Sequence, residues 1–269
     1  MPELPEVETI VRDLSKSLKC KKFAEVMVRD AFLLRQPADD FIRRIKGQIA
    51  LNITRRGKAI IIHLHSGEFL VVQLMMTGQL ITNGQEEKHT RIKFLLSDDN
   101  QLLYNDQRRF GQLRVVGALS EIKHFNILGP EPFDKEFTPE LMHAAFKKTS
   151  RPIKNILLDH TFVAGIGNIY ACEILYRSCI SPKRQARRIS LTEAKTIHRY
   201  IVEVLKEAIK HRGSSLRNYR DGAGQKGRFN ERLAVYGRPN LPCLRCKQPI
   251  LRIVQAGRST FYCGHCQNK

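Results

Sequence analysis

The chain has 269 residues, of which 42% are hydrophobic, so it can bury the cores of one large domain or of two ordinary ones. Its formal net charge of +20 favours a polyanionic partner, because lysines and arginines that neutralise phosphates release condensed counterions. The sequence has no run of about 18 apolar residues and no long basic amphipathic helix, which argues against a membrane partner. The acidic N-terminus lacks the apolar segment of a secretion signal, so we expect a cytoplasmic protein that binds nucleic acid.

The first half of the chain is predicted to be rich in β-strands. It opens with a helix over residues 5–18, where apolar residues recur at helical spacing, and a second helix is expected near residues 37–46. The β-rich runs are residues 24–30, 49–54, 58–64, 69–74, 91–96, 101–105 and 112–117. Most connections are only a few residues long, which predicts an antiparallel β-sandwich flanked by helices over residues 1–130.

After the Gly-Pro linker near residues 129–132 the patterns become helical. Helices are predicted after an N-cap at Thr138, over residues 153–160 and 168–178, and from a capping box at Ser190 to about residue 211. Residues 213–230 are Gly-rich and basic, so we expect a mobile loop. These signals predict an α+β protein with a helical domain over residues 131–240, which includes this loop, and a cysteine-bearing segment over residues 241–269.

Two C-x-x-C pairs lie near the C-terminus. They are formed by Cys243, Cys246, Cys263 and Cys266, four of the seven cysteines of the chain. Two thiolate pairs on tight turns supply the four soft ligands of a tetrahedral Zn²⁺ site, and a pair of redox-active dithiols is the alternative. Between the pairs, residues 250–255 and 258–262 alternate as a β-hairpin, so we predict a zinc ribbon held together by one structural Zn²⁺ ion.

Three further residues are candidates for binding phosphate. The Gly165-Ile166-Gly167-Asn168 turn precedes a helix, and glycines let the backbone approach an anion at the free N–H groups of the first turn. Asn168 suits an N-cap or a phosphate contact, and Lys154 could reach the same phosphate. Arg258 follows the hairpin tip, where a guanidinium can bind phosphate through two nitrogens. An ordinary tight turn and solvated basic side chains remain the alternatives.

The N-terminal segment is chemically unusual. A mature chain that starts at Pro2 would present a secondary amine, and attack of this amine on C1′ of a deoxyribose gives a cationic iminium that acidifies the C2′ hydrogens. Glu3 and Glu6 lie one residue and one helical turn away, in reach to act as acid or base. The alternative is a segment that only starts a helix, with its carboxylates facing the helix dipole.

Four features occur in order over essentially the full chain: Pro2-Glu3-Leu4-Pro5-Glu6-Val7-Glu8-Thr9, Arg56-Gly57-Lys58, Gly165-Ile166-Gly167-Asn168 and the four-cysteine ribbon. In this combination the chain resembles the bacterial formamidopyrimidine-DNA glycosylases, also called 8-oxoguanine DNA glycosylases. The resemblance implies a monomeric, nucleoid-associated enzyme of base excision repair. Such an enzyme removes oxidised purines from double-stranded DNA and cleaves abasic sites by β- and δ-elimination.

The resemblance also implies catalytic roles. Pro2 would be the Schiff-base nucleophile, Glu3 would assist protonation of the sugar or of the leaving base, and Glu6 would support the amine. Lys58 matches the family's β-hairpin lysine, which contacts phosphate and the lesion site. The alternative for Lys58 is one more cation in a basic stretch.

Eversion of a damaged nucleotide leaves a gap in the DNA stack that must be filled. The family fills this gap with a Met, Arg and Phe triad, which the resemblance places at Met76, Arg108 and Phe110. The register against Gly78 favours Met76 over Met75, and strand alternation sends one of the two methionines inward.

The remaining implied contacts fall into two groups. The DNA contacts are His89, Arg108, Lys154, Asn168 and Arg258. The contacts to an everted lesion are Glu173 together with Ser215, Arg217 and Tyr219 in the loop over residues 213–230, which closes over the lesion in the family.

Two alternative functions remain open at this point. The sister group, endonuclease VIII, prefers oxidised pyrimidines, but it typically has Gly where this chain has Leu4 and lacks the Met, Arg and Phe triad. A zinc-ribbon DNA-binding module without catalysis is the second alternative. Thr77 and Thr90 depart from common family residues, which affects the expected lesion preference and not the chemistry.

Overall fold

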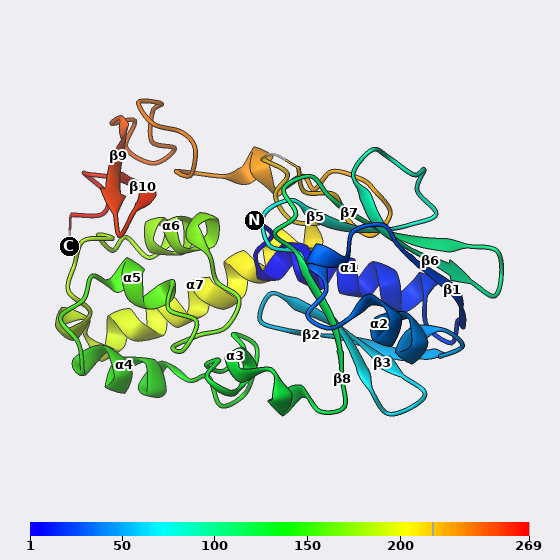
Figure 1. Cartoon of the computed structure of the whole chain (residues 1–269). Coiled ribbons are helices and arrows are strands. Elements are labelled where there is room, and N and C mark those ends of the chain that lie inside the picture. The colour runs from blue at the N-terminus through cyan, green and yellow to red at the C-terminus, as the bar shows by residue number, and fades with distance from the viewer. Residues whose placement is uncertain (217, 269) are drawn as a thin grey trace. The chain divides into compact units, whose positions relative to one another are not determined.

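The computed structural model describes residues 1–216 and 218–268, and the chain divides into two compact units (Figure 1). The N-terminal unit comprises Met1–Asn126 and Ile209–Asn230, and the C-terminal unit comprises Ile127–Ala208 and Glu231–Lys269. The predicted domain limits differ from this division, because residues 213–230 belong to the N-terminal unit and the cysteine-bearing segment packs with the helices.

The N-terminal unit contains two four-stranded antiparallel sheets (Figure 1). One has the order β1 (Phe23–Val28), β6 (Thr90–Leu96), β7 (Gln101–Asp106), β5 (Gly78–Thr82). The other has the order β2 (Ala50–Arg56), β3 (Ala59–Leu64), β4 (Phe69–Gln73), β8 (Gln112–Val116). The antiparallel β-sandwich is as predicted, except that the pattern does not reveal strand β5, since it begins at Gly78 and alternates over very few residues.

Helices flank these sheets within the same unit. They are α1 (Leu4–Ser17), α2 (Ala38–Ile45) and α3 (Lys123–Asn126), with short 3-10 turns at Ala31–Leu33 and Leu119–Glu121. Another 3-10 turn, Phe229–Arg232, spans the boundary at residues 230 and 231 where the chain passes from this unit to the C-terminal one. The apolar stripe of α1 is fully buried at Leu4, Val7, Ile10 and Leu14, and α1 packs against β2. Because α1 shares one core with both sheets, the residues just before it are held in place.

The C-terminal unit contains α4 (Pro139–Lys147), α5 (Ile153–Leu157), α6 (Asn168–Arg177), a 3-10 turn at Ala186–Arg188 and all but the last two residues of α7 (Leu191–Lys210). Both predicted N-termini are present: the Thr138 hydroxyl accepts from Leu141 N at 3.2 Å, and Ser190 N donates to Glu193 Oε2 at 2.8 Å. The hairpin β9 (Ile250–Gln255) and β10 (Arg258–Cys263) follows. Among the described residues, no helix is both long and apolar enough to cross a membrane.

Candidate active site and metal centre

Pro2 and Glu3 lie directly before the first turn of α1, and both are buried. Glu3 N donates to Glu6 Oε2 at 2.8 Å, so the Glu6 carboxylate caps the start of the helix. In a chain that keeps Met1, the Pro2 nitrogen is part of a peptide bond. It becomes an amine only when Met1 is removed, in a position that the capped helix start holds in place.

Glu6 also ties the distant loop to the N-terminus. Its Oε1 accepts from Ser214 N at 2.7 Å, and its carbonyl accepts from the Tyr219 hydroxyl at 3.3 Å. Gly213 has φ +76°, and a Cβ there would lie 2.7 Å from Glu6 Oε1, so only glycine fits. Glu6 is 2% exposed, and therefore both of its carboxylate bonds are made away from water.

We expect the Glu6→Gln variant to lose about 1–3 kcal/mol of stability, the usual cost of a buried N–H left without an acceptor. A carboxamide offers one acceptor oxygen, whereas Glu3 N and Ser214 N each need one. Urea unfolding measures the difference, and Glu25→Gln, at an exposed position on β1, is the matched control. Equal stability of the two variants would contradict this role of Glu6.

Lys58 lies at the tight turn between β2 and β3, as predicted for a hairpin lysine. Gly57 adopts φ +56°, and Arg55 stabilises the turn by donating from Nη1 to the Gly57 carbonyl at 2.9 Å. The same guanidinium donates from Nε to Glu8 Oε2 at 3.1 Å. The Lys58 turn is therefore attached to α1, the helix that Pro2 precedes.

The structure brings the three residues of the predicted triad together in the N-terminal unit. Arg108 Nη1 lies 3.2 Å from Met76 Sδ, and Arg108 Cζ lies 4.6 Å from the centre of the Phe110 ring. Met76 and Phe110 are 39% and 46% exposed, which is high for large apolar residues. The expectation that one methionine turns inward is wrong: Met75 is also exposed, because β4 ends at Gln73 and the alternation ends with it.

His89 lies beside the strand that leads to Arg108. Its carbonyl accepts from Asp106 N at 3.0 Å, and its Nδ1 lies 3.3 Å from Arg91 Nη2. His89 is half-buried at this edge of the sheet. Its predicted DNA contact is compatible with this position.

The loop over residues 213–230 is more strongly anchored than its composition suggests. The Asp221 carboxylate is fully buried and accepts from Ala223 N at 3.0 Å, Gln225 N at 2.8 Å and Arg212 Nε at 2.6 Å. Arg212 also pairs with Asp13 of α1 at 2.6 Å. The anchors in this part of the loop are carboxylates and not the apolar residues whose scarcity suggested a mobile segment.

Ser215 and Tyr219, two of the predicted lesion contacts in this loop, have different surroundings in the structure. The Ser215 hydroxyl donates to the Tyr219 carbonyl and accepts from Gly227 N, both at 2.9 Å, so it organises the loop itself. Tyr219 is 9% exposed and belongs to the core of the N-terminal unit. In this structure Tyr219 is a packing residue and not an exposed lesion contact. Arg217 lies outside the described residues.

In the C-terminal unit, Lys154 and Asn168 link the helices to the zinc-ribbon hairpin. The Lys154 side chain is fully buried, and its Nζ donates to Asn168 Oδ1 at 2.6 Å and to Thr260 Oγ1 at 2.7 Å. Asn168 Nδ2 donates to the Ser259 carbonyl at 2.8 Å. Lys154 is therefore not a solvated lysine on a helix face, and in this structure its ammonium group is not exposed to a phosphate in solvent. Asn168 is the first residue of α6 and not its N-cap, which is Gly167.

Arg258 begins β10 and is exposed, directly after the turn residues Ala256 and Gly257. Both turn residues have positive φ, +46° and +70°, as a two-residue hairpin turn requires. The bond from Asn168 to Ser259 holds the strand next to Arg258, so the hairpin tip has a fixed position within this unit.

Glu173 is predicted to contact the lesion, but its carboxylate is fully buried. It accepts three backbone N–H bonds, from Ala234, Val235 and Tyr236, at 2.9 to 3.0 Å. Burial raises the pKa of Glu173, and the three N–H groups oppose this shift. In this structure the Glu173 carboxylate binds the backbone of the segment that leads to the zinc ribbon. The position of Glu173 in the sequence does not indicate this role.

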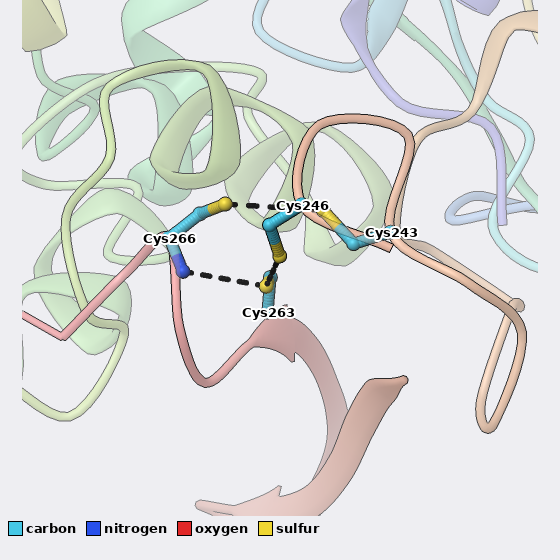
Figure 2. A group of neighbouring side chains, drawn as sticks. All are labelled: Cys243, Cys246, Cys263 and Cys266. Atoms are coloured by element: carbon cyan, nitrogen blue, oxygen red, sulfur yellow. Dashed lines mark hydrogen bonds between the residues drawn. The ribbon is translucent and has the colours of Figure 1, made fainter. Parts of the chain in front are cut away.

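The four cysteines of the two C-x-x-C pairs converge on one point (Figure 2). Their sulfur atoms all lie within 4.8 Å of one another, with 3.4 Å between Cys246 and Cys263 and 3.9 Å between Cys243 and Cys266. Zn–S bonds of about 2.3 Å in a tetrahedron place sulfurs about 3.8 Å apart, so the donor set fits one Zn²⁺. The convergence of both C-x-x-C pairs on one point favours the predicted metal site over two separate redox-active dithiols.

Family models match three parts of the chain. Residues 1–113 match the formamidopyrimidine-DNA glycosylase N-terminal domain, residues 128–220 match the formamidopyrimidine-DNA glycosylase H2TH domain, and residues 240–269 match the zinc finger found in FPG and IleRS. The chain is 42% identical to the formamidopyrimidine-DNA glycosylase of Desulforamulus reducens over 275 aligned positions, which cover 99% of each chain.

Solved structures of similar proteins agree with these matches. MutM (Fpg) of Thermus thermophilus has a TM-score of 0.91 and 39% identity, covering 100% of this chain and 99% of the other. Lactococcus lactis Fpg with abasic-site DNA has a TM-score of 0.92 and 33% identity, covering 99% and 100%. A mutant of the Lactococcus lactis protein, with DNA that contains Fapy-dG, has a TM-score of 0.92 at 32% identity, covering 100% of both chains. The chain described here therefore belongs to the formamidopyrimidine-DNA glycosylase family.

Proposed function

We propose that this chain is a bifunctional DNA glycosylase of base excision repair that removes 8-oxoguanine and formamidopyrimidines from double-stranded DNA and cleaves the resulting abasic site. The observation that carries the proposal is Pro2 at the capped start of α1, in a chain that matches this family over its full length. The net charge of +20 suits a DNA ligand. Similar structures hold DNA with a Fapy-dG lesion or an abasic site.

The proposed reaction begins when the Pro2 nitrogen attacks C1′ of the damaged nucleotide. The N–C1′ bond forms, the glycosidic bond breaks, and the base leaves with the bonding electron pair and takes up a proton that Glu3 delivers. The Pro2 nitrogen then loses its proton, and its lone pair breaks the C1′–O4′ bond, so that O4′ takes up a proton as a hydroxyl and C1′ becomes part of a ring-opened iminium. The iminium loses a C2′ proton, and the electrons of that C–H bond expel the 3′ phosphate. A second elimination expels the 5′ phosphate, and hydrolysis of the imine returns Pro2. Lys58 is proposed to contact the phosphate beside the lesion, and Glu6 to hold the segment that carries the amine.

The proposed DNA contacts come from both units. Met76, Arg108 and Phe110 would fill the gap left by the everted nucleotide, since two are exposed apolar side chains and the arginine can hydrogen-bond the orphaned cytosine. His89, Asn168 and Arg258 would contact phosphates. One Zn²⁺ on the four cysteines would be structural, since all four positions of a tetrahedral site are taken by protein.

We further propose that the enzyme acts as a monomer in the cytoplasm, on the DNA of the nucleoid. The proposal of a monomer is supported by the presence of all three domain matches in one chain, and the proposal of action on DNA by the abasic-site DNA in a similar structure.

Borohydride reduction tests the catalytic part of the proposal. Protein that starts at Pro2 should form a stable covalent adduct with duplex DNA that contains an abasic site, because hydride reduces the imine. If no adduct forms, the alternative function, a DNA-binding module without catalysis, is supported instead. Comparison of 8-oxoguanine opposite cytosine with thymine glycol tests the substrate, and a clear preference for thymine glycol would identify the activity of the sister group.

The Arg258→Ala variant should bind DNA more weakly on every sequence, and the slope of log affinity against log salt should fall by about 1. The reason is that loss of one phosphate contact releases about one fewer counterion. Titration of a labelled duplex at several salt concentrations measures the slope. Arg199→Ala on α7, where the arginine is 60% exposed, is the matched control and should keep the slope of the unmodified protein.

A further inference from the structure

Met76 belongs to one turn, and Arg108 and Phe110 belong to another. Residues 74–77 connect β4 to β5, and residues 107–111 connect β7 to β8, so each turn passes from one sheet to the other. Strand pairing keeps the two turns adjacent at both ends, because Gly78 pairs with Asp106 and Gln73 pairs with Gln112. Strand pairing therefore brings the two turns together. It does not extend to Met76, Arg108 and Phe110, so other bonds must fix the conformation of the turns.

A single buried carboxylate bonds to both turns. Asp106 is fully buried, and its Oδ2 accepts from Gly111 N at 2.8 Å while its Oδ1 accepts from Arg108 N at 3.2 Å. The Thr77 hydroxyl of the other turn donates to Asp106 Oδ1 and accepts from Arg108 N at 3.0 Å. Asp106 thus closes the second turn on itself and joins it to the first.

These bonds lie next to each of the three exposed side chains. Met76 directly precedes Thr77, Arg108 is itself held through its N–H, and Phe110 directly precedes Gly111. A Cβ at position 111 would lie 1.6 Å from the Tyr104 hydroxyl and 3.0 Å from Asp106 Oδ2, so glycine is required for this approach. Each side chain of the triad is therefore at most one residue away from the group that Asp106 holds.

Arg109, between Arg108 and Phe110, is directed elsewhere. It adopts φ +59°, uncommon for a residue with a side chain, and its Nε pairs with Asp30 Oδ2 at 2.6 Å. This backbone conformation leaves Arg108 and Phe110 stacked on each other while Arg109 is turned away. A turn with a strained residue needs strong local bonds to persist, and Asp106 supplies them.

We propose that Asp106, together with Thr77, is a positioning residue for DNA insertion: it sets Met76, Arg108 and Phe110 in the arrangement that fills the gap left by an everted base. The proposal rests on the proposed function, since it presupposes that these three residues enter DNA. It assigns Asp106 no contact with the DNA and no role in the covalent chemistry. It therefore predicts damage to steps that need gap filling and not to imine formation itself.

The test compares a substrate that has a gap to fill with one that has none. The first is 8-oxoguanine opposite cytosine in duplex DNA, and the second is an abasic site in single-stranded DNA, which lacks an opposite base. We expect Asp106→Asn and Thr77→Val to slow single-turnover excision from the duplex about 10- to 100-fold, the usual cost of misplaced groups. Borohydride trapping on the single strand should keep the rate of the unmodified protein.

Two further variants separate positioning from general damage. Thr77→Ser keeps the hydroxyl and should restore duplex excision, and Asp98→Asn, at an exposed ion pair of the same unit, should leave both rates unchanged. If Asp106→Asn does not fold, the comparison of duplex excision by Thr77→Val and by Thr77→Ser tests the proposal on its own. The proposal is overturned if both substrates slow by the same factor, if duplex excision is unaffected, or if Thr77→Ser is as slow as Thr77→Val. Inactivity of the unmodified protein on both substrates would instead contradict the proposed function.

Discussion

Protein that retains Met1 is expected to form no covalent adduct with abasic-site DNA under borohydride, whereas protein that starts at Pro2 is trapped. An acylated proline nitrogen has its lone pair delocalised into the carbonyl, so it cannot attack C1′. Loss of a covalent nucleophile typically lowers rates by on the order of 10⁴-fold or more. The structure adds that this nitrogen lies in a buried, capped helix start, where a neighbouring residue cannot easily replace it.

The experiment uses two preparations whose intact masses establish whether Met1 is present. In one, Met1 has been removed, and in the other a bulky residue inserted between Met1 and Pro2 prevents removal. Both should bind a duplex that carries a tetrahydrofuran abasic analogue, which shows that the DNA contacts survive. An adduct formed by the extended chain at the rate of the shorter one would rule out Pro2 as the nucleophile.

Removal of the metal should unfold the zinc-ribbon hairpin and abolish tight DNA binding. The hairpin has a small core, and structural zinc supplies roughly 10–16 kcal/mol of binding energy in zinc-finger peptides. Loss of the hairpin also removes Thr260 and the Ser259 carbonyl, which are the partners of Lys154 and Asn168. A lysine that is fully buried in the intact protein would then lose an acceptor, and the turn before α6 would lose its support.

Cys263→Ser, at a fully buried ligand, should reproduce the effect of a chelator, whereas Cys20→Ser, at an exposed cysteine outside the cluster, should have none. Metal analysis should give one zinc per chain for the unmodified protein. Limited proteolysis reports the folding of β9 and β10, and titration of the tetrahydrofuran duplex reports binding. Protease resistance of a metal-free hairpin would contradict the structural role of the metal.

Several features of the site follow from local sequence patterns. The helix start at Pro2–Glu6, the turn at Lys58 and the cysteine hairpin depend on contacts between residues close in sequence, and for these the pattern predicts the structure. The caps at Thr138 and Ser190 are of the same kind. The triad of Met76, Arg108 and Phe110 follows from resemblance and not from pattern, since without it the methionines would be interpreted as ordinary strand residues.

The burial of polar side chains is the feature of the candidate site that the sequence could not reveal. Asp106 and Asp221 look like surface aspartates in the sequence, yet both are fully buried and their carboxylates accept bonds from backbone or arginine donors that folding brings to them. Lys154 is predicted as a phosphate contact from its place in the chain, and Glu173 and Tyr219 as lesion contacts from the resemblance, whereas the structure buries all three. Burial of a polar side chain depends on which distant donors and acceptors reach it, and no local period encodes that.

Periodicity, turn chemistry and cysteine spacing by themselves determined the antiparallel sheets, the helical second half and the four-thiol cluster, since each depends on repeated local preferences or on ligand chemistry. Only the tertiary structure decided that the loop at residues 213–230 is anchored through Asp221 and Glu6, and that Asp106 joins the two turns of the triad. These bonds join residues up to 208 positions apart. Their partners become neighbours only after the apolar core has brought α1, the sheets and the loop together.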